Sequence, residues 1–415
     1  MWYRVNDQVV LRVAAGEPDG PVGVYLCSFA ESLSQQGYGR KYVQRQVMLA
    51  AGFSHWLKQM GVVRRGITSG HPTRYLSYRH RRRRPRKGDC AALNHFIEFL
   101  RREKAIPAEK IPRRQVTPVE KCVRAYEVYL FEERALAQAT VINYCPFILE
   151  FLKERFGSGP VELSGLRANE IIRFVQRQAQ RLHLKRAKLL TTALRSFFQY
   201  ARYRGQIRVD LATAVPCVAN WSMPSIPRGI APDQVRRLLS QIDRSTAVGR
   251  RDYAILLLLA RLGLRSGEVA FLELDDIDLK AGCLSVHGKG GRQTQLPLPK
   301  EVGGAIVAYL RHGRPRSTSR RVFLTARAPV RGFLSQCAVG TIVRHAILRT
   351  GIEAPTTGAH QFRHGLATEM LRRGASLGQI GELLGHKSPE TTKIYTKVDL
   401  KALHTLALPW PRGVR

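Results

Sequence analysis

A chain of 415 residues is longer than one ordinary domain, so two or three domains are expected. Its apolar content of 44% is enough for sizeable cores, which excludes a generally disordered protein. The 68 Lys and Arg against 31 Asp and Glu give a net charge of +37, which favours a polyanionic partner, nucleic acid before a membrane surface, and predicts that salt governs binding.

The seven cysteines are odd in number and scattered, and no two form a Cys-x-x-Cys pair. This pattern favours a reducing compartment and no structural zinc. The first ten residues lack the apolar segment of a secretory signal, and the longest apolar run, residues 253–260, is too short to cross a bilayer. We therefore expect a cytoplasmic protein without membrane association.

The first 112 residues are predicted to form a small basic helical module. Short strand-like or irregular pieces up to about residue 20 precede two helices between residues 21 and 60, with a break near Gly37, and a further helix at residues 90–102. The run from residue 79 to 88 is almost entirely basic. It is either a solvated, mobile segment or a linker that contacts phosphates, and we favour the second. The basic side chains of this run are Arg79, Arg81, Arg82, Arg83, Arg84, Arg86 and Lys87.

A second helical domain is predicted from residue 116 to 206. It begins with the capping box Thr117-Pro118-Val119-Glu120, and Pro146 is expected to kink or break the start of its second helix. The last helix has an apolar face and a basic face suited to DNA, which carries Lys185, Arg186 and Lys188. The four helices are expected at residues 119–132, 139–155, 167–181 and 185–203.

A linker without periodicity is expected at residues 207–229, followed by a mixed, mainly helical domain at residues 230–406. A buried helix at 250–264 runs into Arg265, which is either a surface residue paired with Glu268 or a fixed anion ligand at the edge of the core. Other expected elements are helices at 232–242, 301–312 and 336–350, a strand at 322–325, and strands at 283–287 and 292–298 around a glycine-rich turn that carries Lys289.

The stretch from residue 358 to 398 combines three short motifs. His360 and Arg363 are three residues apart on one face of a predicted amphipathic helix, so they can address the same small anion. A second helix closes at Gly385, directly before His386. A third helix is expected from about residue 389, which places Tyr395 roughly two turns inside it. Each motif alone also has an ordinary structural explanation, such as a solvated face or a half-buried tyrosine.

Taken together, these motifs resemble the tyrosine recombinases, also called the phage integrase family, and their Xer-like branch most closely. That family has His-x-x-Arg, then Leu-Gly-His about two dozen residues later, then a nucleophilic tyrosine nine residues after that histidine. The chain matches at His360, Arg363, His386 and Tyr395, with Phe362 where leucine is more usual. Order, spacing and residue types agree together, so the match is specific.

The resemblance covers about residues 116–406 and implies the fold class. It implies a mainly α protein with a small β-hairpin or sheet in a mixed α+β catalytic domain, preceded by a helical core-binding domain, the two forming a C-shaped clamp on DNA. Residues 1–112 depart from the family pattern and would be an arm-site DNA-binding domain or a second clamp. The expected boundaries are 1–112, 116–206, a linker at 207–229, a catalytic domain at 230–406 and a tail at 407–415.

The resemblance also implies roles for residues outside these motifs. Arg265 lies in a Gly-Leu-Arg-x-x-Glu pattern that carries the family's first catalytic arginine, and Glu268 would orient its neighbours. Lys289 occupies the Gly-Lys-Gly setting of a mobile hairpin lysine, the general acid toward the leaving 5′-hydroxyl, with Arg292 as the less favoured choice. The expected catalytic set is Arg265, Lys289, His360, Arg363, His386 and Tyr395.

The chemistry of such a set can be followed from its side chains. A tyrosine hydroxyl attacks phosphorus only if preset cations and donors hold the extra negative charge of the transition state. Arg265 and Arg363 can grip phosphate oxygens, His360 can take or relay the tyrosine proton, and His386 can donate a hydrogen bond. The 3′-phosphotyrosine keeps the energy of the phosphodiester, so we expect no ATP, no metal and no cofactor, in agreement with the lack of a Walker A sequence or an acidic cluster.

We therefore predict a site-specific recombinase of a mobile element, either an integrase or a recombinase of a transposon or plasmid. Its partner would be double-stranded DNA, on which a homo- or hetero-tetramer would assemble at paired sites, with or without accessory recombinases. A final amphipathic helix at residues 399–410 would dock in a neighbouring subunit or pack within the chain. The alternatives are a type IB topoisomerase-like relaxation enzyme and a DNA-binding architectural or regulatory protein with an inactive site.

Overall fold

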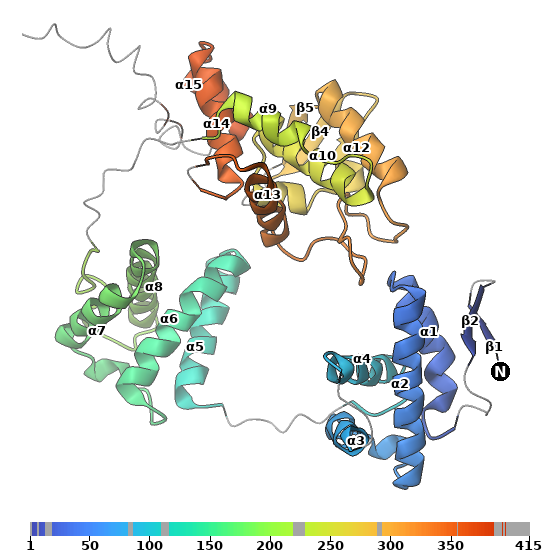
Figure 1. The fold of residues 1–415 in the computed structure, drawn as a ribbon. Coiled ribbons are helices and arrows are strands. Elements are labelled where there is room, and N and C mark those ends of the chain that lie inside the picture. Colours follow the sequence, from blue (N-terminus) through green and yellow to red (C-terminus); the bar gives the residue numbers. More distant parts are fainter. Residues whose placement is uncertain are drawn as a thin grey trace, which may run out of the picture. The chain divides into compact units, whose positions relative to one another are not determined.

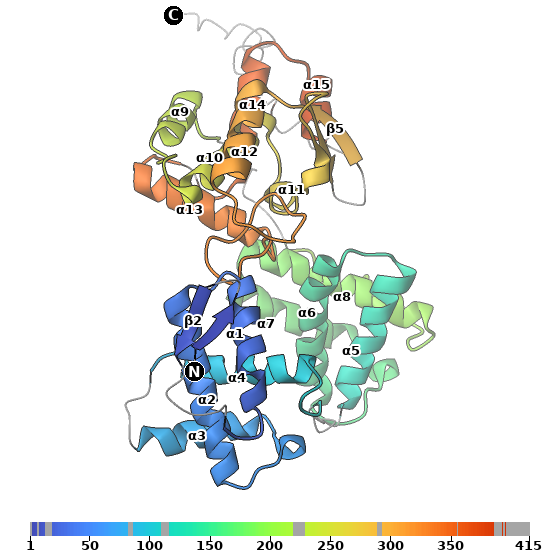
Figure 2. The same cartoon turned by 90° about the vertical axis from the view of Figure 1, so that its right-hand side faces the viewer.

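The computed structural model divides into two compact units, Met1–Glu109 with Ile226–Arg415 and Lys110–Ser225, which are described separately (Figures 1 and 2). The described part is mainly helical, as predicted, and none of its helices is long and apolar enough to span a membrane. The structure describes the backbone of residues 2–5 and 8–12, and residues 19–81, 86–108, 116–218, 229–288, 293–354, 356–385, 392 and 395.

The first helices of the chain surround a core of their own. Helix α2 packs against α1 and α4, and α3 packs against α2 and α4. Phe29, Phe53, Phe96 and Leu57 are fully buried among them. The elements are the antiparallel strands β1 (Trp2–Val5) and β2 (Gln8–Arg12), short 3-10 helices at Gly23–Tyr25 and Arg64–Gly66, and helices α1 (Leu26–Gln35), α2 (Arg40–Gln59), α3 (Gly70–His80) and α4 (Asp89–Arg102).

Helix α3 was missed from the sequence, because residues 64–87 are mostly polar and basic, and the basic run was expected to be a linker from residue 79. The helix instead continues to His80, and Tyr75 and Leu76 are buried on its inner face. Arg79 is therefore a helical residue, and its Nη1 atom lies 2.9 Å from Oδ2 of Asp89. Arg45 of α2 binds the other oxygen of this carboxylate at 3.0 Å. Asp89 is only 4% exposed, so this double ion pair ties α2, α3 and α4 together.

The unit Lys110–Ser225 contains the four helices that the sequence predicted. The Thr117 hydroxyl accepts from the Glu120 N–H at 3.2 Å, and the Glu120 carboxylate accepts from the Thr117 N–H at 3.1 Å, which confirms the capping box. Pro146 lies inside an unbroken helix. The elements are α5 (Pro118–Val128) with a π-helical end at Tyr129–Glu133, α6 (Gln138–Phe156), a 3-10 helix at Leu163–Gly165, α7 (Ala168–Arg181) and α8 (Leu184–Tyr203).

Part of the stretch expected to be linker packs into this second unit. Ile207, Leu211, Ala212 and Val215 are buried in the same core as the four helices. The ordered fold of the unit therefore extends beyond the end of α8 at Tyr203. The prolines at 216, 224 and 227 favoured a linker for the whole stretch, although Ile207, Leu211 and Val215 follow one another at intervals of four residues.

The segment from residue 229 onward has a third, larger core. Helix α10 crosses its centre and packs against α9, α12 and α14, and its residues 254–260 are all buried. The expected strand at 322–325 is wrong, since Leu324 makes one isolated bridge, to Gly332, and no strand forms there. The elements are α9 (Pro232–Ser240), α10 (Ala247–Leu262), α11 (Ser266–Ala270), a 3-10 helix at Leu274–Asp276, β3 (Ile277–Asp278), β4 (Cys283–His287), β5 (Gln293–Pro297), α12 (Lys300–His312), α13 (Cys337–Thr350), α14 (His360–Arg372) and α15 (Leu377–Leu384).

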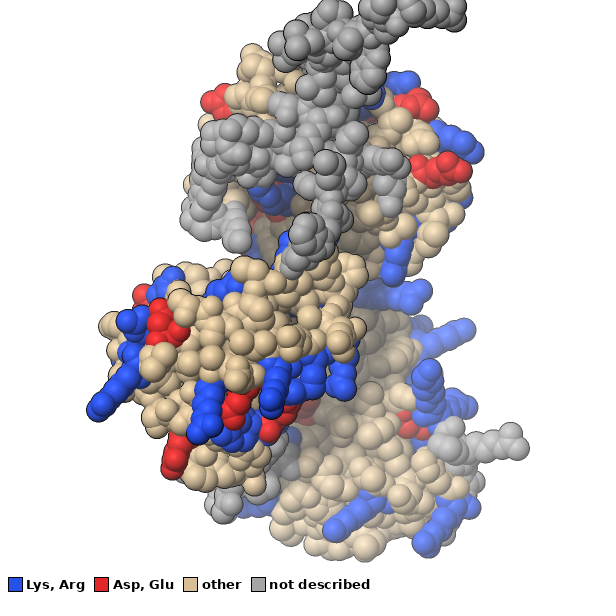
Figure 3. Space-filling view, turned by 90° about the vertical axis from the view of Figure 1, so that its left-hand side faces the viewer, with Lys and Arg blue, Asp and Glu red and all other residues tan. Residues whose placement is uncertain are grey.

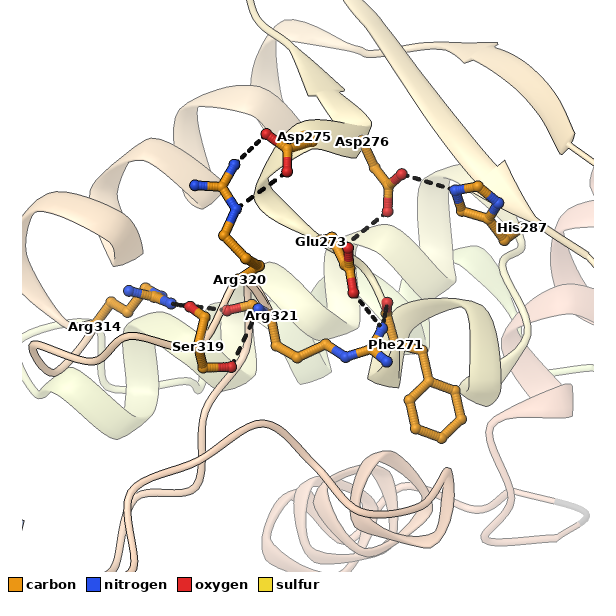
Figure 4. Close-up of polar contacts among 9 residues, drawn as sticks. All are labelled: Phe271, Glu273, Asp275, Asp276, His287, Arg314, Ser319, Arg320 and Arg321. Atoms are coloured by element: carbon orange, nitrogen blue, oxygen red, sulfur yellow. Dashed lines mark hydrogen bonds and ion pairs between the residues drawn. The ribbon is translucent and has the colours of Figure 1, made fainter. Parts of the chain in front are cut away.

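Strands β3, β4 and β5 form an antiparallel sheet, and a polar network connects it to the chain on either side (Figure 4). His287 at the end of β4 lies 2.9 Å from Asp276, whose other oxygen accepts from the Glu273 N–H at 2.8 Å. Glu273 in turn pairs with Arg321 at 3.3 Å. The end of β4 is thereby held to the segment that follows α11.

The double ion pair of Asp89 generates a testable prediction for the N-terminal helices. The substitution Asp89→Asn leaves two guanidinium groups without their carboxylate, so the opening free energy of this module should fall by about 1–3 kcal/mol. Burial alone would raise the pKa of Asp89, but Arg45 and Arg79 lower it below its usual value. Its stabilisation is therefore present at neutral pH and lost as pH falls through that lowered value.

Hydrogen exchange at the backbone amides of α4 measures this free energy. The matched control is Asp19→Asn, which removes an exposed carboxylate that pairs with Lys58 and His55. It should leave the exchange of α4 unchanged. Equal effects of the two substitutions would contradict the structural role of Asp89.

Candidate functional site

Arg363 is the most buried charged side chain of the site. It extends from the first turn of α14, is 5% exposed, and donates from Nη1 to the Gly263 carbonyl at 2.8 Å and from Nη2 to the Leu384 carbonyl. Both carbonyls lie at helix ends, where the last acceptors have no partner within the helix. One guanidinium therefore joins the ends of α10 and α15 to the start of α14.

Gly263 allows the end of α10 to lie close to α14 and α15. It ends α10 with a φ of 61°, in the left-handed region that favours glycine. A Cβ atom here would lie 2.7 Å from Cδ2 of Leu384 and 3.1 Å from Cδ2 of Leu366. The close contact between the end of α10 and α15 thus depends on the absence of a side chain.

Arg265 follows two residues later, at the N-terminus of α11, and the expected pairing with Glu268 is present. Its Nη1 lies 2.6 Å from Glu268, which also accepts from the Arg265 N–H at 2.7 Å. Glu268 is buried, with 8% of its side chain exposed, whereas Arg265 exposes 34%. Its Nη2 donates to the Gly385 carbonyl at 3.4 Å. Glu268 therefore orients a guanidinium that remains accessible from one side.

The electrostatics of the site reflect its accumulated positive charge. Burial, with the nearby Arg265, lowers the pKa of Arg363 to about 10, so this guanidinium is still charged at neutral pH. Burial and the same two arginines lower the pKa of His360 below its usual value. At neutral pH His360 is therefore an uncharged imidazole beside two cations.

Tyr395 contacts a histidine that we did not predict. Its hydroxyl lies 3.0 Å from Nδ1 of His364, one turn after His360 on the same face of α14. Burial raises the pKa of Tyr395, with Arg363 opposing the change, and lowers that of His364. Tyr395 is 1% exposed and packs with Ala367, Ile380 and Leu384. The spacing of four residues from His360 could have identified His364 in the sequence.

The structure thus brings together Arg265, Glu268, His360, Arg363 and Tyr395. It does not describe Lys289, Arg292 or His386, nor the third helix and the terminal helix expected after them. Among the residues predicted to contact DNA, Arg82, Arg83 and Arg84 also lie outside the described residues, and Arg79 pairs with Asp89. Arg81, Arg86, Lys87, Lys185 and Arg186 are exposed, and Lys188 is partly exposed.

Cationic side chains are spread over the face shown in Figure 3, where Asp and Glu are fewer. On α8, the guanidinium of Arg186 lies 4.8 Å from the centre of the Phe147 ring, which holds this charge close to the helix surface.

Among the described residues, no group of three or more His, Cys, Asp or Glu side chains could hold a metal ion. The described part of the site contains two arginines, the carboxylate of Glu268, two histidines with lowered pKa values and the phenol of Tyr395.

The contact at Gly263 generates a prediction for the stability of this site. Gly263→Ala should lower the free energy of unfolding by about 2–4 kcal/mol, because it combines a left-handed backbone strain with a clash against Leu384. Gly282→Ala is the matched control, since Gly282 has a φ of 66° but nothing within 4 Å of an added Cβ. It should cost about 1 kcal/mol. Chemical denaturation of the two variants measures both values, and equal costs would contradict the packing role.

Two family models match this chain. "Phage integrase family" matches residues 228–401, and "Phage integrase, N-terminal SAM-like domain" matches residues 123–205. The first match contains the core at residues 230–362, and the second overlaps the core at residues 119–215. Arg265, His360, Arg363, His364 and Tyr395 all fall inside the first match.

Similar proteins of known sequence carry names from the same family. The chain is 55% identical over 411 residues to "Putative integrase/recombinase y4rA" of Sinorhizobium fredii, a match that spans 99% of each chain. It is 32% identical over 276 residues to "Tyrosine recombinase XerD" of Listeria monocytogenes, covering 65% of this chain and 91% of XerD.

Among solved structures, the XerH site-specific recombinase bound to a palindromic difH substrate matches the fold with a TM-score of 0.55 and 20% identity, over 75% of this chain and 93% of XerH. The chain is therefore a member of the tyrosine recombinase, or phage integrase, family.

Proposed function

We propose that this recombinase cuts and rejoins double-stranded DNA at specific sites, with Tyr395 as the nucleophile. The phenol oxygen would form a bond to phosphorus while the bond from phosphorus to the 5′ oxygen breaks, giving a 3′-phosphotyrosine and a free 5′-hydroxyl. Attack by a 5′-hydroxyl from the partner strand would reverse the step and release the tyrosine. The observation that supports this most is the Tyr395 hydroxyl, 3.0 Å from His364 on the helix that carries Arg363.

His364 is proposed as the first acceptor of the tyrosine proton. Its lowered pKa keeps the imidazole neutral at physiological pH, so Nδ1 can accept the hydrogen bond of the phenol. The sequence had suggested His360 for this step, but it is His364 that contacts the hydroxyl. Both Arg363 and Arg265 act electrostatically on His360. His360 would therefore donate a hydrogen bond to the phosphate that these arginines bind.

The two arginines would hold the charge that develops on the phosphate. Arg363 contributes a fixed cation whose position is set by backbone carbonyls, which needs no reorganisation during the reaction. Arg265, oriented by Glu268 and exposed on one side, would grip a non-bridging oxygen. A mutational loss of one such contact typically costs about 10²–10³-fold in rate.

Two further roles are proposed for residues outside the described part. Lys289, in the turn between β4 and β5, would protonate the departing 5′ oxygen, and His386 would donate to the phosphate. The polar network of His287 and Asp276 supports the first role, because it fixes the base of that turn relative to the segment after α11. Every proton in the cycle would then have a named donor and acceptor, with no metal or nucleotide required.

Integration or excision of a mobile element is the biological reaction we propose. The name of the y4rA relative, an integrase/recombinase that aligns over 99% of this chain, supports it. We further propose that the domains at residues 116–206 and 230–406 close around the DNA as a clamp, that residues 1–112 form an additional domain, and that subunits pair sites as a tetramer. The XerH structure, solved on its difH substrate, supports DNA as the partner.

Covalent trapping tests the proposed nucleophile. The protein is incubated with nicked duplexes taken from the ends of its own element, and a denaturant-resistant adduct is expected. Tyr395→Phe removes the nucleophilic oxygen and should abolish the adduct while leaving DNA binding intact. DNA binding without an adduct in the wild type would instead favour the inactive, DNA-binding alternative, and relaxation of plasmids lacking paired sites would favour the topoisomerase-like one.

The pH dependence of cleavage tests the role of His364. Because its lowered pKa keeps the base form available, the wild-type rate should stay level near neutral pH and fall only below about pH 6.5, as the imidazole becomes protonated. His364→Ala should lower the rate by about 10²-fold and remove that acidic limb.

The exposed histidine of α13 provides the control, and His345→Ala should behave like the wild type. The variant His360→Ala tests the alternative, in which His360 accepts the tyrosine proton. If the acidic limb persists in His364→Ala and disappears in His360→Ala, the proton transfer belongs to His360.

A further inference from the structure

An open groove of about 1310 Å³ lies on the N-terminal module, lined by α2, α3 and the residues that lead into α4. Four cationic side chains line it, Lys41 and Arg45 from α2, Arg79 from α3 and Arg86 before α4. Asp89 is the one carboxylate among its described lining residues. The family models begin at residue 123, so neither covers this groove.

The segment of sequence that forms the groove is strongly basic. Between Glu31 and Asp89 the chain contains fourteen Lys and Arg and not one Asp or Glu. This acid-free stretch includes all of α2 and α3. An ordinary solvated surface mixes both signs of charge, whereas exclusion of one sign over two helices is typical of a surface that binds a polyanion.

Asp89 organises these cations rather than opposing a ligand. Its two oxygens are occupied by Arg45 and Arg79, at 3.0 and 2.9 Å, and its carboxylate is buried. The two guanidiniums are thus held in place at the floor of the groove before any ligand arrives. Lys41 and Arg86 are exposed beside them. A preset row of cations loses less side-chain entropy on binding than a mobile one.

The aromatic residues of the groove indicate which form of nucleic acid fits. Proteins that hold single strands stack bases on exposed rings. Trp56 and Tyr75 are each 6% exposed and pack on one another at 5.7 Å. Tyr78, 37% exposed, lies against Trp56 at 6.4 Å. Tyr78 thus gives the described lining a single open ring, whereas a single strand needs a series of rings for successive bases. Four cations beside one open ring suit the phosphate backbone of a duplex.

We propose that this groove binds the phosphate backbone of double-stranded DNA, as a contact additional to the one made by the two family domains. The proposal rests on the proposed function only in its choice of DNA over RNA. The binding would be independent of base sequence, since it uses phosphates. It would increase the time that the recombinase spends on DNA and make that time steeply dependent on salt.

The test compares full-length proteins that all carry Tyr395→Phe, so that only non-covalent binding is measured. Fluorescence anisotropy with a short duplex of random sequence gives affinity over a series of salt concentrations. The double substitution Lys41→Ala and Arg86→Ala should weaken binding and reduce the slope of log affinity against log salt by about two, one for each lost phosphate contact.

The matched control is Arg65→Ala with Arg74→Ala. These two arginines are exposed on the same module, outside the groove lining, and their removal changes the net charge by the same amount. The control should keep the wild-type slope within about half a unit. Equal slopes for groove variant and control would overturn the proposal.

Competition then identifies the ligand. A random duplex should displace the labelled DNA more effectively than a single strand of equal charge, an RNA duplex or vesicles containing anionic lipid. Stronger competition by any of the other three would overturn the assignment to duplex DNA. Loss of the adduct in the wild type itself would count against the proposed function and not against the groove.

Discussion

The buried guanidinium of Arg363 is the contact on which the arrangement of the active site depends. Its two hydrogen bonds end on carbonyls from residues 263 and 384, which are distant in sequence, and so fix α10, α14 and α15 relative to one another. Leaving a buried charge without its partners costs several kcal/mol, so these three helix ends cannot separate independently. His360 lies on α14, Arg265 follows the end of α10 by three residues, and Tyr395 packs against residues of α14 and α15. The cation thus serves the fold and the chemistry together.

Sequence patterns were sufficient to predict the elements that short-range interactions determine. The capping box at Thr117 and the buried helix that ends at Gly263 follow from short-range hydrogen bonding and from apolar spacing, and both are present. Helix α3 has few apolar residues among many polar ones, and it is held by packing of Tyr75 against Phe53 and Trp56. The run at 322–325 is apolar because it is buried, not because it pairs as a strand.

The active site was predictable as a list of residue types and only partly as a set of contacts. Arg265, His360, Arg363 and Tyr395 were recognisable from their motif, which states order and spacing. The contact between His364 and Tyr395 joins residues 31 positions apart and depends on how α14 packs beside α15. The pairing of Arg79 with Asp89 is of the same kind, since it converts an apparent linker charge into part of a helical core. Neither contact produces a repeating pattern in the sequence from which it could be predicted.

The small size of the cluster around Tyr395 has a consequence for how the domain works. Tyr395 packs with three buried residues, Ala367, Ile380 and Leu384, in a cluster separate from the main core. Its buried ring contributes about 1.5–3 kcal/mol and its hydrogen bond to His364 about 0.5–1.5 kcal/mol. That sum is below the roughly 5–15 kcal/mol that holds a whole domain together. The Tyr395 side chain can therefore leave its contacts at a cost below that of unfolding the domain, so the nucleophile can be released while the main core stays folded.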